Sequence, residues 1–454
     1  MEYSRLLSDF CHDLTYDKLP AEVVEKAKLC VLDYVANVYG SLELDAVKKV
    51  ADSVKSLGPG DITCLGCGFS APINEAVFMN GVLAEAIEAQ DGLRFGGNHP
   101  GTAVIPVALG LAEKNKKDGK AVINAIVAGY EAADRAAAAV HPRHTLSGFL
   151  PTGTTGTFGA AIAAARLIGL DKEKTLCALG NAGYLLPLSM AEQLMGGFTV
   201  KIVQGGKAAQ SGLMAANLAA CGITGMPYVF EGSQLNGGFC KITTDQPPAL
   251  DRITDKLGER LTILDIYFKP FTACRHTHGS AQATLGLLAE NKFGPADVEK
   301  VEVFTYGIAV IAVGKQVKLN DSFVNAQFSI PYVVSVCVAD GRLGPSQLTE
   351  KRLSDKNLID FTKKVTITYD DELNKLYPGK TASRVQITLK DGRKLTRQVD
   401  MPKGDPRDPM EAKDVAQKVR QFAGARDKKK VDLLIERILK LESVTDITEI
   451  TKLI

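Results

Sequence analysis

The chain has 454 residues, of which 45% are hydrophobic and 23% are charged, a composition typical of a soluble globular protein with a large core. This length favours two domains. A formal net charge of only +2 gives no reason to expect nucleic acid or an anionic membrane as a partner. The sequence has no apolar run of membrane-spanning length and no signal-peptide pattern, and its nine cysteines are scattered. We therefore expect a cytoplasmic protein with reduced thiols.

Up to about residue 260 the sequence shows helical periodicity and no alternating strand pattern. Between Val24 and Val38, apolar residues recur at steps of three and four, with charged residues on the opposite face. Further helices are expected over residues 46–57, 73–87, 102–113, 121–139, 157–168, 172–186 and 206–220. These patterns predict an all-helical domain, interrupted by a short extended or turn segment over 62–70.

The pattern changes near Thr262. Alternating strands are expected at 301–305 and 365–369, and a hairpin with an Asp-Gly turn is expected over 385–399. Helices are expected between them, over 280–291 and 323–339, and helical patterns return after residue 410. The predicted fold is therefore mostly α: a large helical domain built from both chain ends, 1–266 and 403–454, with a smaller α+β domain, 267–402, inserted between them.

Candidate catalytic residues cluster where the helix predicted over 73–87 ends. Glu88 and Asp91 follow this helix, and a glycine-rich link then presents His99 just before the next helix. Two carboxylates and an imidazole are suitable groups for proton transfer at carbon. The alternative interpretation is a polar turn in which the acids only cap or brace the chain.

Further candidates lie at the domain junction and on two other helices. Lys201 precedes a Gly-Gly helix start, and Arg275 is a second cation suited to holding a carboxylate. His276 and His278 are two residues apart, so only one of them is expected to face a cleft if the segment is extended. Tyr332 lies on an apolar helix, where a core position with a bonded hydroxyl is the alternative. The Cys64–Cys67 pair has no partner pair at metal-binding spacing, and no metal site is expected.

Several of these segments together resemble the MmgE/PrpD family, which contains 2-methylcitrate dehydratases, cis-aconitate decarboxylases and iminodisuccinate epimerases. The likeness covers nearly the whole chain and rests on the order and spacing of residues 99–101, 156–161, 206–209, 275–278, 329–332 and 403–406. It implies a helical domain formed by both chain ends, an α+β lid, a homodimer, and an active site between the domains without metal or organic cofactor. Its motifs place the site at Glu88, Asp91, His99, Lys201, His278 and Tyr332.

Two positions depart from the family pattern. The family usually has an Asp-Phe-Asp-Asp run where this chain has residues 88–91, and usually a histidine where this chain has Leu150. One carboxylate is thus a methylene longer and one acid–base group is missing. His141 and His144 are candidates to replace that histidine.

We expect a cofactor-independent lyase acting on a small polycarboxylate, and we favour a 2-methylcitrate-type dehydratase. His99 is the expected proton carrier, with Asp91, His278 or Tyr332 as a second acid. Lys201, Arg275 and His276 are expected to bind the substrate. The alternatives are an epimerase of an imino- or hydroxy-dicarboxylate, a cis-aconitate-type decarboxylase, and a family member that binds ligands without catalysis.

Overall fold

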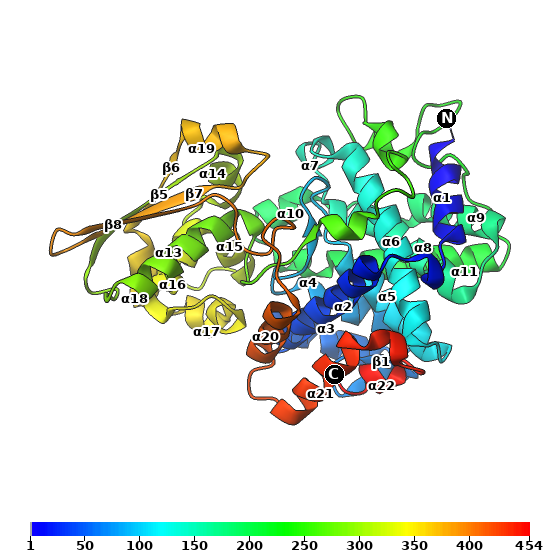
Figure 1. The fold of residues 1–454 in the computed structure, drawn as a ribbon, viewed down its shortest axis with the longest axis horizontal. Helices are drawn as coiled ribbons and strands as arrows, with labels where there is room; N and C mark the ends of the chain where they lie inside the picture. Colours follow the sequence, from blue (N-terminus) through cyan, green and yellow to red (C-terminus); the bar gives the residue numbers. More distant parts are fainter. Residues whose placement is uncertain (1) are drawn as a thin grey trace.

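A computed structural model describes residues 2–454. It is 58% helical with only 9% strand, which confirms the predicted mostly-α fold. Figure 1 shows a large helical body and a smaller part that carries the main sheet and extends to the left. Within residues 2–454, none of the helices combines the length and apolar character needed to cross a membrane.

The helical body is formed first by the N-terminal half of the chain. Its helices are α1 (Tyr3–Asp13), α2 (Ala21–Ser41), α3 (Asp45–Ser56), α4 (Ile73–Glu85), α5 (Gly101–Lys114), α6 (Gly119–Val140), α7 (Arg143–Leu146), α8 (Pro151–Ile168), α9 (Lys172–Leu185), α10 (Ala191–Met195), α11 (Gln204–Ala220) and α12 (Phe239–Ile242). Asp118 and Asp171 start α6 and α9 by accepting hydrogen bonds from backbone N–H groups three residues on.

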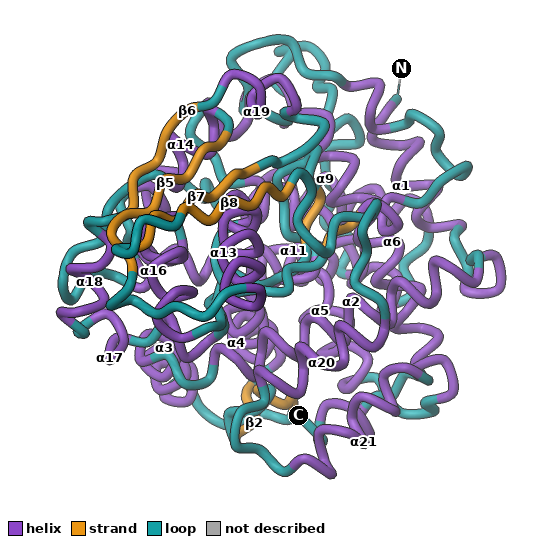
Figure 2. The backbone as a smooth tube through the Cα atoms, turned by 60° about the vertical axis from the view of Figure 1, so that its left-hand side comes forward, coloured by secondary structure: helices purple, strands orange, loops and turns teal. Residues whose placement is uncertain are grey.

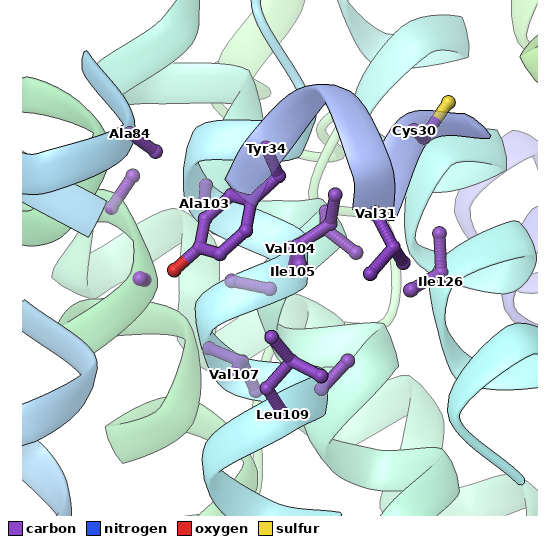
Figure 3. Close-up of a cluster of buried hydrophobic side chains, with 14 of the residues drawn as sticks. Cys30, Val31, Tyr34, Ala84, Ala103, Val104, Ile105, Val107, Leu109 and Ile126 are labelled. Atoms are coloured by element: carbon purple, nitrogen blue, oxygen red, sulfur yellow. The ribbon is translucent and has the colours of Figure 1, made fainter. Parts of the chain in front are cut away.

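The core of this body lies around α5 and α8, which are buried on nearly every side. Their many Ala and Gly residues allow close helix packing. Figure 3 shows Val104 and Ile105 of α5 among Val31 and Tyr34 of α2 and Ile126 of α6. This core supports the two ends of the segment that links α4 to α5.

The expectation of an all-helical domain is wrong in detail, because the body contains two small antiparallel ribbons. One pairs β1 (Ile62–Cys64) with β2 (Phe69–Ala71), within the segment expected to be extended. The other pairs β3 (Gly92–Leu93) with β4 (Ile266–Tyr267). Strands of two residues are too short to produce a sequence periodicity.

The smaller part is built around a four-stranded sheet. Its elements are α13 (His278–Glu290), β5 (Val298–Thr305), α14 (Gly307–Val313), α15 (Phe323–Gln327), α16 (Ile330–Asp340), α17 (Glu350–Leu353), α18 (Lys356–Thr362), β6 (Val365–Tyr369), α19 (Asp371–Leu376), β7 (Ser383–Leu389) and β8 (Lys394–Val399). The strand order is β6-β5-β7-β8, with β5 and β6 parallel and the other pairs antiparallel. Figure 2 shows the strands beside α13 and α16.

In the smaller part, the predicted hairpin is present but the predicted single helix is not. The hairpin is present, and Gly392 adopts a φ of 88° in its turn, a conformation that glycine tolerates. The single helix expected over 323–339 is wrong, because the structure has α15 and α16 instead. Ser329 caps α16 by accepting a hydrogen bond from the Tyr332 backbone N–H, and Pro331 sits in its first turn.

The last helices return to the helical body, as Figure 1 shows in orange and red. They are α20 (Ala412–Phe422), α21 (Lys428–Leu439) and α22 (Thr448–Thr451). Lys418 of α20 forms a buried ion pair with Asp33 of α2, with Nζ and Oδ1 2.6 Å apart. Both chain ends therefore meet in one body, whereas the domain boundaries at 266/267 and 402/403 stay a prediction.

Candidate active site

The segment between α4 and α5 brings the predicted acids and His99 together. Helix α4 ends at Glu85, the chain passes through Glu88, Asp91 and β3, and α5 begins at Gly101, just after His99. Glu88 has a φ of 54°, a left-handed conformation that is uncommon outside glycine. Strain of this kind persists where surrounding contacts fix it and is frequent at functional sites.

Those contacts are two buried lysines. Lys269 Nζ donates to Glu88 Oε1 at 2.7 Å and lies 3.3 Å from the Glu88 carbonyl oxygen. Lys201 Nζ donates to Glu88 Oε2 and also to Glu85 Oε1, the latter at 2.8 Å. All four side chains are buried, so together they form a charge cluster in which two carboxylates balance two ammonium groups.

The cluster determines the protonation of its members. Burial opposes ionisation of Glu88, but Lys201 and Lys269 outweigh it and lower the pKa of this carboxyl well below its ordinary value. Burial, together with the charge of Glu88, raises the pKa of Glu85. Two of the N–H groups of Lys201 already donate to Glu85 and Glu88. An ammonium group has three N–H donors, which leaves one on Lys201 for a ligand.

His99 lies beside this cluster with a fixed tautomer. Its Nδ1 is 2.5 Å from the backbone oxygen of Asp91, and because a carbonyl only accepts, Nδ1 carries the proton. Its Nε2 then has a free lone pair and lies 3.9 Å from Glu88 Oε1. Burial and the charge of Lys269 lower the pKa of His99 to about 3, so the ring is neutral at pH 7. Only glycine fits at position 92, since a Cβ there would lie 2.8 Å from His99 Nδ1.

The carboxyl group of Asp91 is bonded to groups other than His99. It accepts hydrogen bonds from the Tyr130 hydroxyl at 2.6 Å and from the Gly101 backbone N–H at 3.2 Å. Burial raises the pKa of Asp91 to about 7. In this arrangement its backbone carbonyl orients His99, while its carboxyl group braces the start of α5.

Arg275 and His276 lie at the junction between the helical body and the smaller part. Arg275 donates from Nη1 to the Lys403 carbonyl at 2.8 Å and from Nη2 to the Pro402 carbonyl at 2.6 Å. His276 Nδ1 is 2.6 Å from the Tyr306 hydroxyl. Burial and the charges of Lys269 and Arg275 lower the pKa of His276 to about 4. Arg275 also lies over the ring of Tyr267, 5.2 Å from its centre, and Tyr267 pairs with Gly92 in the β3–β4 ribbon that leads to His99.

His278 and Tyr332 are both bonded to backbone carbonyls, and His278 also lies beside Arg275, with Nδ1 3.5 Å from Arg275 Nη1. His278 is fully buried at the first position of α13, with Nε2 3.0 Å from the Ala273 carbonyl oxygen. Tyr332 is fully buried in α16, where its hydroxyl donates to the Gln347 carbonyl at 2.5 Å. Each therefore holds a structural hydrogen bond.

The region around Leu150 contains two other histidines. Leu150 is the N-cap residue of α8. His144 is turned into the interior, with Nε2 2.7 Å from Thr154 Oγ1 and its ring stacked on Phe149. His141 instead lies against Gly97, in the loop that leads to His99.

Sequence reasoning did not include Glu85 and Lys269 among the site residues. Glu85 had a detectable signal, because an acid on an otherwise apolar, buried helix is unusual unless it is paired. Lys269 lies near the domain junction, and nothing in the local sequence indicates its pairing with Glu88, 181 positions away. Among residues 2–454, no group of three or more His, Cys, Asp or Glu side chains is placed to hold a metal ion.

Known proteins resemble this chain along its full length. It is 27% identical to a cis-aconitate decarboxylase of Aspergillus terreus, with 99% of this chain and 96% of that protein aligned. It is 26% identical to the cis-aconitate decarboxylase of Homo sapiens, with 98% and 92% aligned. The corresponding enzyme of Mus musculus is 25% identical, with 98% and 91% aligned. Residues 5–250 match the MmgE/PrpD N-terminal domain and residues 271–441 match the C-terminal domain. The chain therefore belongs to the MmgE/PrpD family.

Proposed function

We propose that this protein is a lyase acting on a small polycarboxylate, and that it decarboxylates a tricarboxylate of the cis-aconitate type. The proposal rests on the geometry of His99: its ring is oriented by the Asp91 carbonyl, and its free Nε2 lies beside the buried charge cluster. The full-length similarity to cis-aconitate decarboxylases supports this reaction over the others of the family.

The proposed reaction needs one proton and stabilisation of negative charge. When the carbon–carbon bond to the leaving carboxylate breaks, carbon dioxide departs and the electron pair forms a new double bond. The former double bond shifts its electrons to the carbon beside a second carboxylate, and that carbon takes up a proton. His99 Nε2 is the proposed donor of this proton.

His99 must therefore be protonated when the substrate is bound. In the free protein its pKa is lowered by burial and by the charge of Lys269. The carboxylates of a bound trianion oppose the effect of Lys269 and raise this pKa. Lys201 and Lys269 retain N–H donors for the substrate, and Arg275 adds a fixed positive charge at the junction.

Dehydration of a 2-methylcitrate-type substrate is the second candidate. It is favoured by the neutral state of His99, because the bare Nε2 is suited to removing a proton from the carbon beside a carboxylate. Epimerisation is less well supported, since it needs a second proton-transfer group on the opposite face, and the hydroxyl of Tyr332 is already bonded to Gln347.

Proton NMR of cis-aconitate and 2-methylcitrate, each incubated with the purified protein in deuterium oxide, tests these reactions. Decarboxylation yields a dicarboxylate with a terminal methylene group and one deuterium on the saturated carbon between the substituted alkene carbon and a carboxylate. Dehydration yields an alkene with loss of the hydroxylated acid. The His99→Gln variant serves as the matched inactive control. If neither acid reacts with the wild-type protein, both proposals are wrong.

A further inference from the structure

The Nδ1 atom of His141 lacks the hydrogen bond that a buried polar atom normally makes. It follows the last residue of α6, and its Nδ1 is shielded from solvent and has no hydrogen-bond partner among the described residues. His144, three positions later, differs in that both of its ring nitrogens have partners. Buried polar groups are rarely left unpaired, and such exceptions often mark functional positions.

The unpaired Nδ1 of His141 lies close to the loop that carries His99. A Cβ atom built on Gly97, two residues before His99, would lie 3.2 Å from Nδ1 of His141 and 3.5 Å from its Cε1. Arg94, in the same loop as Gly97, donates from Nη1 to the Gly379 carbonyl at 2.7 Å. That turn follows Tyr377, which stacks on the Tyr306 ring whose hydroxyl bonds His276. His141 and His276 therefore border the same loop that carries His99.

His276 presents a donor in the same region. The Tyr306 hydroxyl has His276 Nδ1 as its hydrogen-bond partner within the described residues, at 2.6 Å. We therefore assign the hydroxyl proton to this bond, so that Nδ1 accepts and the ring proton of His276 lies on Nε2. Tyr306 is held in place by stacking on Tyr377, with ring centroids 4.8 Å apart.

The cluster of Glu85, Glu88, Lys201 and Lys269 has balanced charges, so a trianionic substrate needs donors beyond it. We propose that His141 and His276 form a second carboxylate-binding subsite, in which an N–H of each imidazole donates to a substrate carboxylate remote from His99. This inference rests on the proposed function and assigns one carboxylate of the substrate to these two imidazoles.

The test measures binding of tricarballylate, a saturated tricarboxylate that cannot undergo the reaction, by titration calorimetry. His141→Leu removes the ring donor and is expected to weaken binding about tenfold or more, the usual effect of losing a hydrogen bond to a charged group. His141→Asn keeps an amide donor near the position of Nδ1 and is expected to restore much of the affinity. His12→Gln, on the outer helix α1, is the matched histidine control and should bind like the wild type.

Kinetics on the reacting substrate give a second measurement. His141→Leu is expected to raise KM with kcat changed less than threefold, whereas His99→Gln lowers kcat. Should the variants misfold, imidazole ¹⁵N spectra of the wild-type protein still report whether tricarballylate shifts the His141 and His276 signals. Equal tricarballylate affinity in the wild type and His141→Leu, or unshifted signals, would overturn the subsite alone. No binding to the wild type would overturn the subsite and the proposed function together.

Discussion

Replacing Lys269 with methionine tests whether the buried charge cluster is held together by its lysines. Lys269 is fully buried and donates to both Glu88 Oε1 and the Glu88 carbonyl, so the variant leaves a buried carboxylate with one cation fewer. Removing one partner of a buried ion pair typically costs about 3–5 kcal/mol. With an unfolding entropy of about 2.1 cal/mol/K per residue, a chain of 454 residues should lose about 3–5 °C in Tm.

Differential scanning calorimetry at neutral pH measures this shift. The matched control is Lys172→Met, because Lys172 pairs with Asp13 at 2.6 Å but both side chains are about half exposed, and its Tm should be nearly unchanged. The double variant Lys269→Met with Glu88→Gln should recover part of the loss, since the carboxylate is then neutral. A Tm for Lys269→Met equal to that of Lys172→Met would refute the reasoning.

The stabilisation by Glu88 depends on pH with a defined sign. Because the pKa of Glu88 is lower in the folded protein than in the unfolded chain, ionised Glu88 contributes fully to the free energy of unfolding above its ordinary pKa of 4.5. This contribution is lost as the pH falls below that value.

Four further predictions concern single side chains of the site. His99→Gln should lower kcat about 10²–10⁴-fold without lowering Tm, and unchanged turnover would exclude His99 as the proton carrier. NMR titration of the free protein should find His99 neutral between pH 5 and 8, because its pKa is lowered to about 3; a midpoint near 6.5 would contradict this. The pKa of Asp91 is raised from 3.8 to about 7, so urea-unfolding stability should fall as pH rises through this window, and Asp91→Asn should flatten that slope. Tyr332→Phe should leave kcat/KM unchanged and cost about 0.5–1.5 kcal/mol of stability for its lost bond to Gln347, whereas a large loss of activity would place its hydroxyl in the site.

The parts of the site that could be predicted from the sequence are local. Glu88 and His99 lie on one short link between two strongly apolar helices, and such a link necessarily brings its residues close together. Lys201 was also identified, but its internal partners were not, because the sequence cannot show that Glu85 and Glu88 already accept its hydrogen bonds. Pairings between residues more than a hundred positions apart depend on the packing of whole helices.

The same distinction holds for the fold. Long periodic segments such as α6 and α9 were predicted to within two residues at each boundary, because an apolar stripe over several turns is a strong signal, whereas the start of α8 was placed six residues too late. The break between α15 and α16 was missed although Ser329 and Pro331 are typical of a helix start. Apolar residues continue across this break, so periodicity alone joined the two helices.

The arrangement of the chain ends explains how the unusual backbone at Glu88 is maintained. Lys269 is placed to donate to the Glu88 carbonyl at 3.3 Å, and Lys418 of α20 donates to the next carbonyl, that of Ala89, at 2.6 Å. Lys418 is itself fixed by its buried ion pair with Asp33 of α2. Both lysines come from beyond residue 266, so the first 266 residues contain the reactive groups but lack the donors that hold their backbone. The site segment is therefore held in part by the last helices returning to α2, and we expect changes in these helices to disturb the backbone at Glu88.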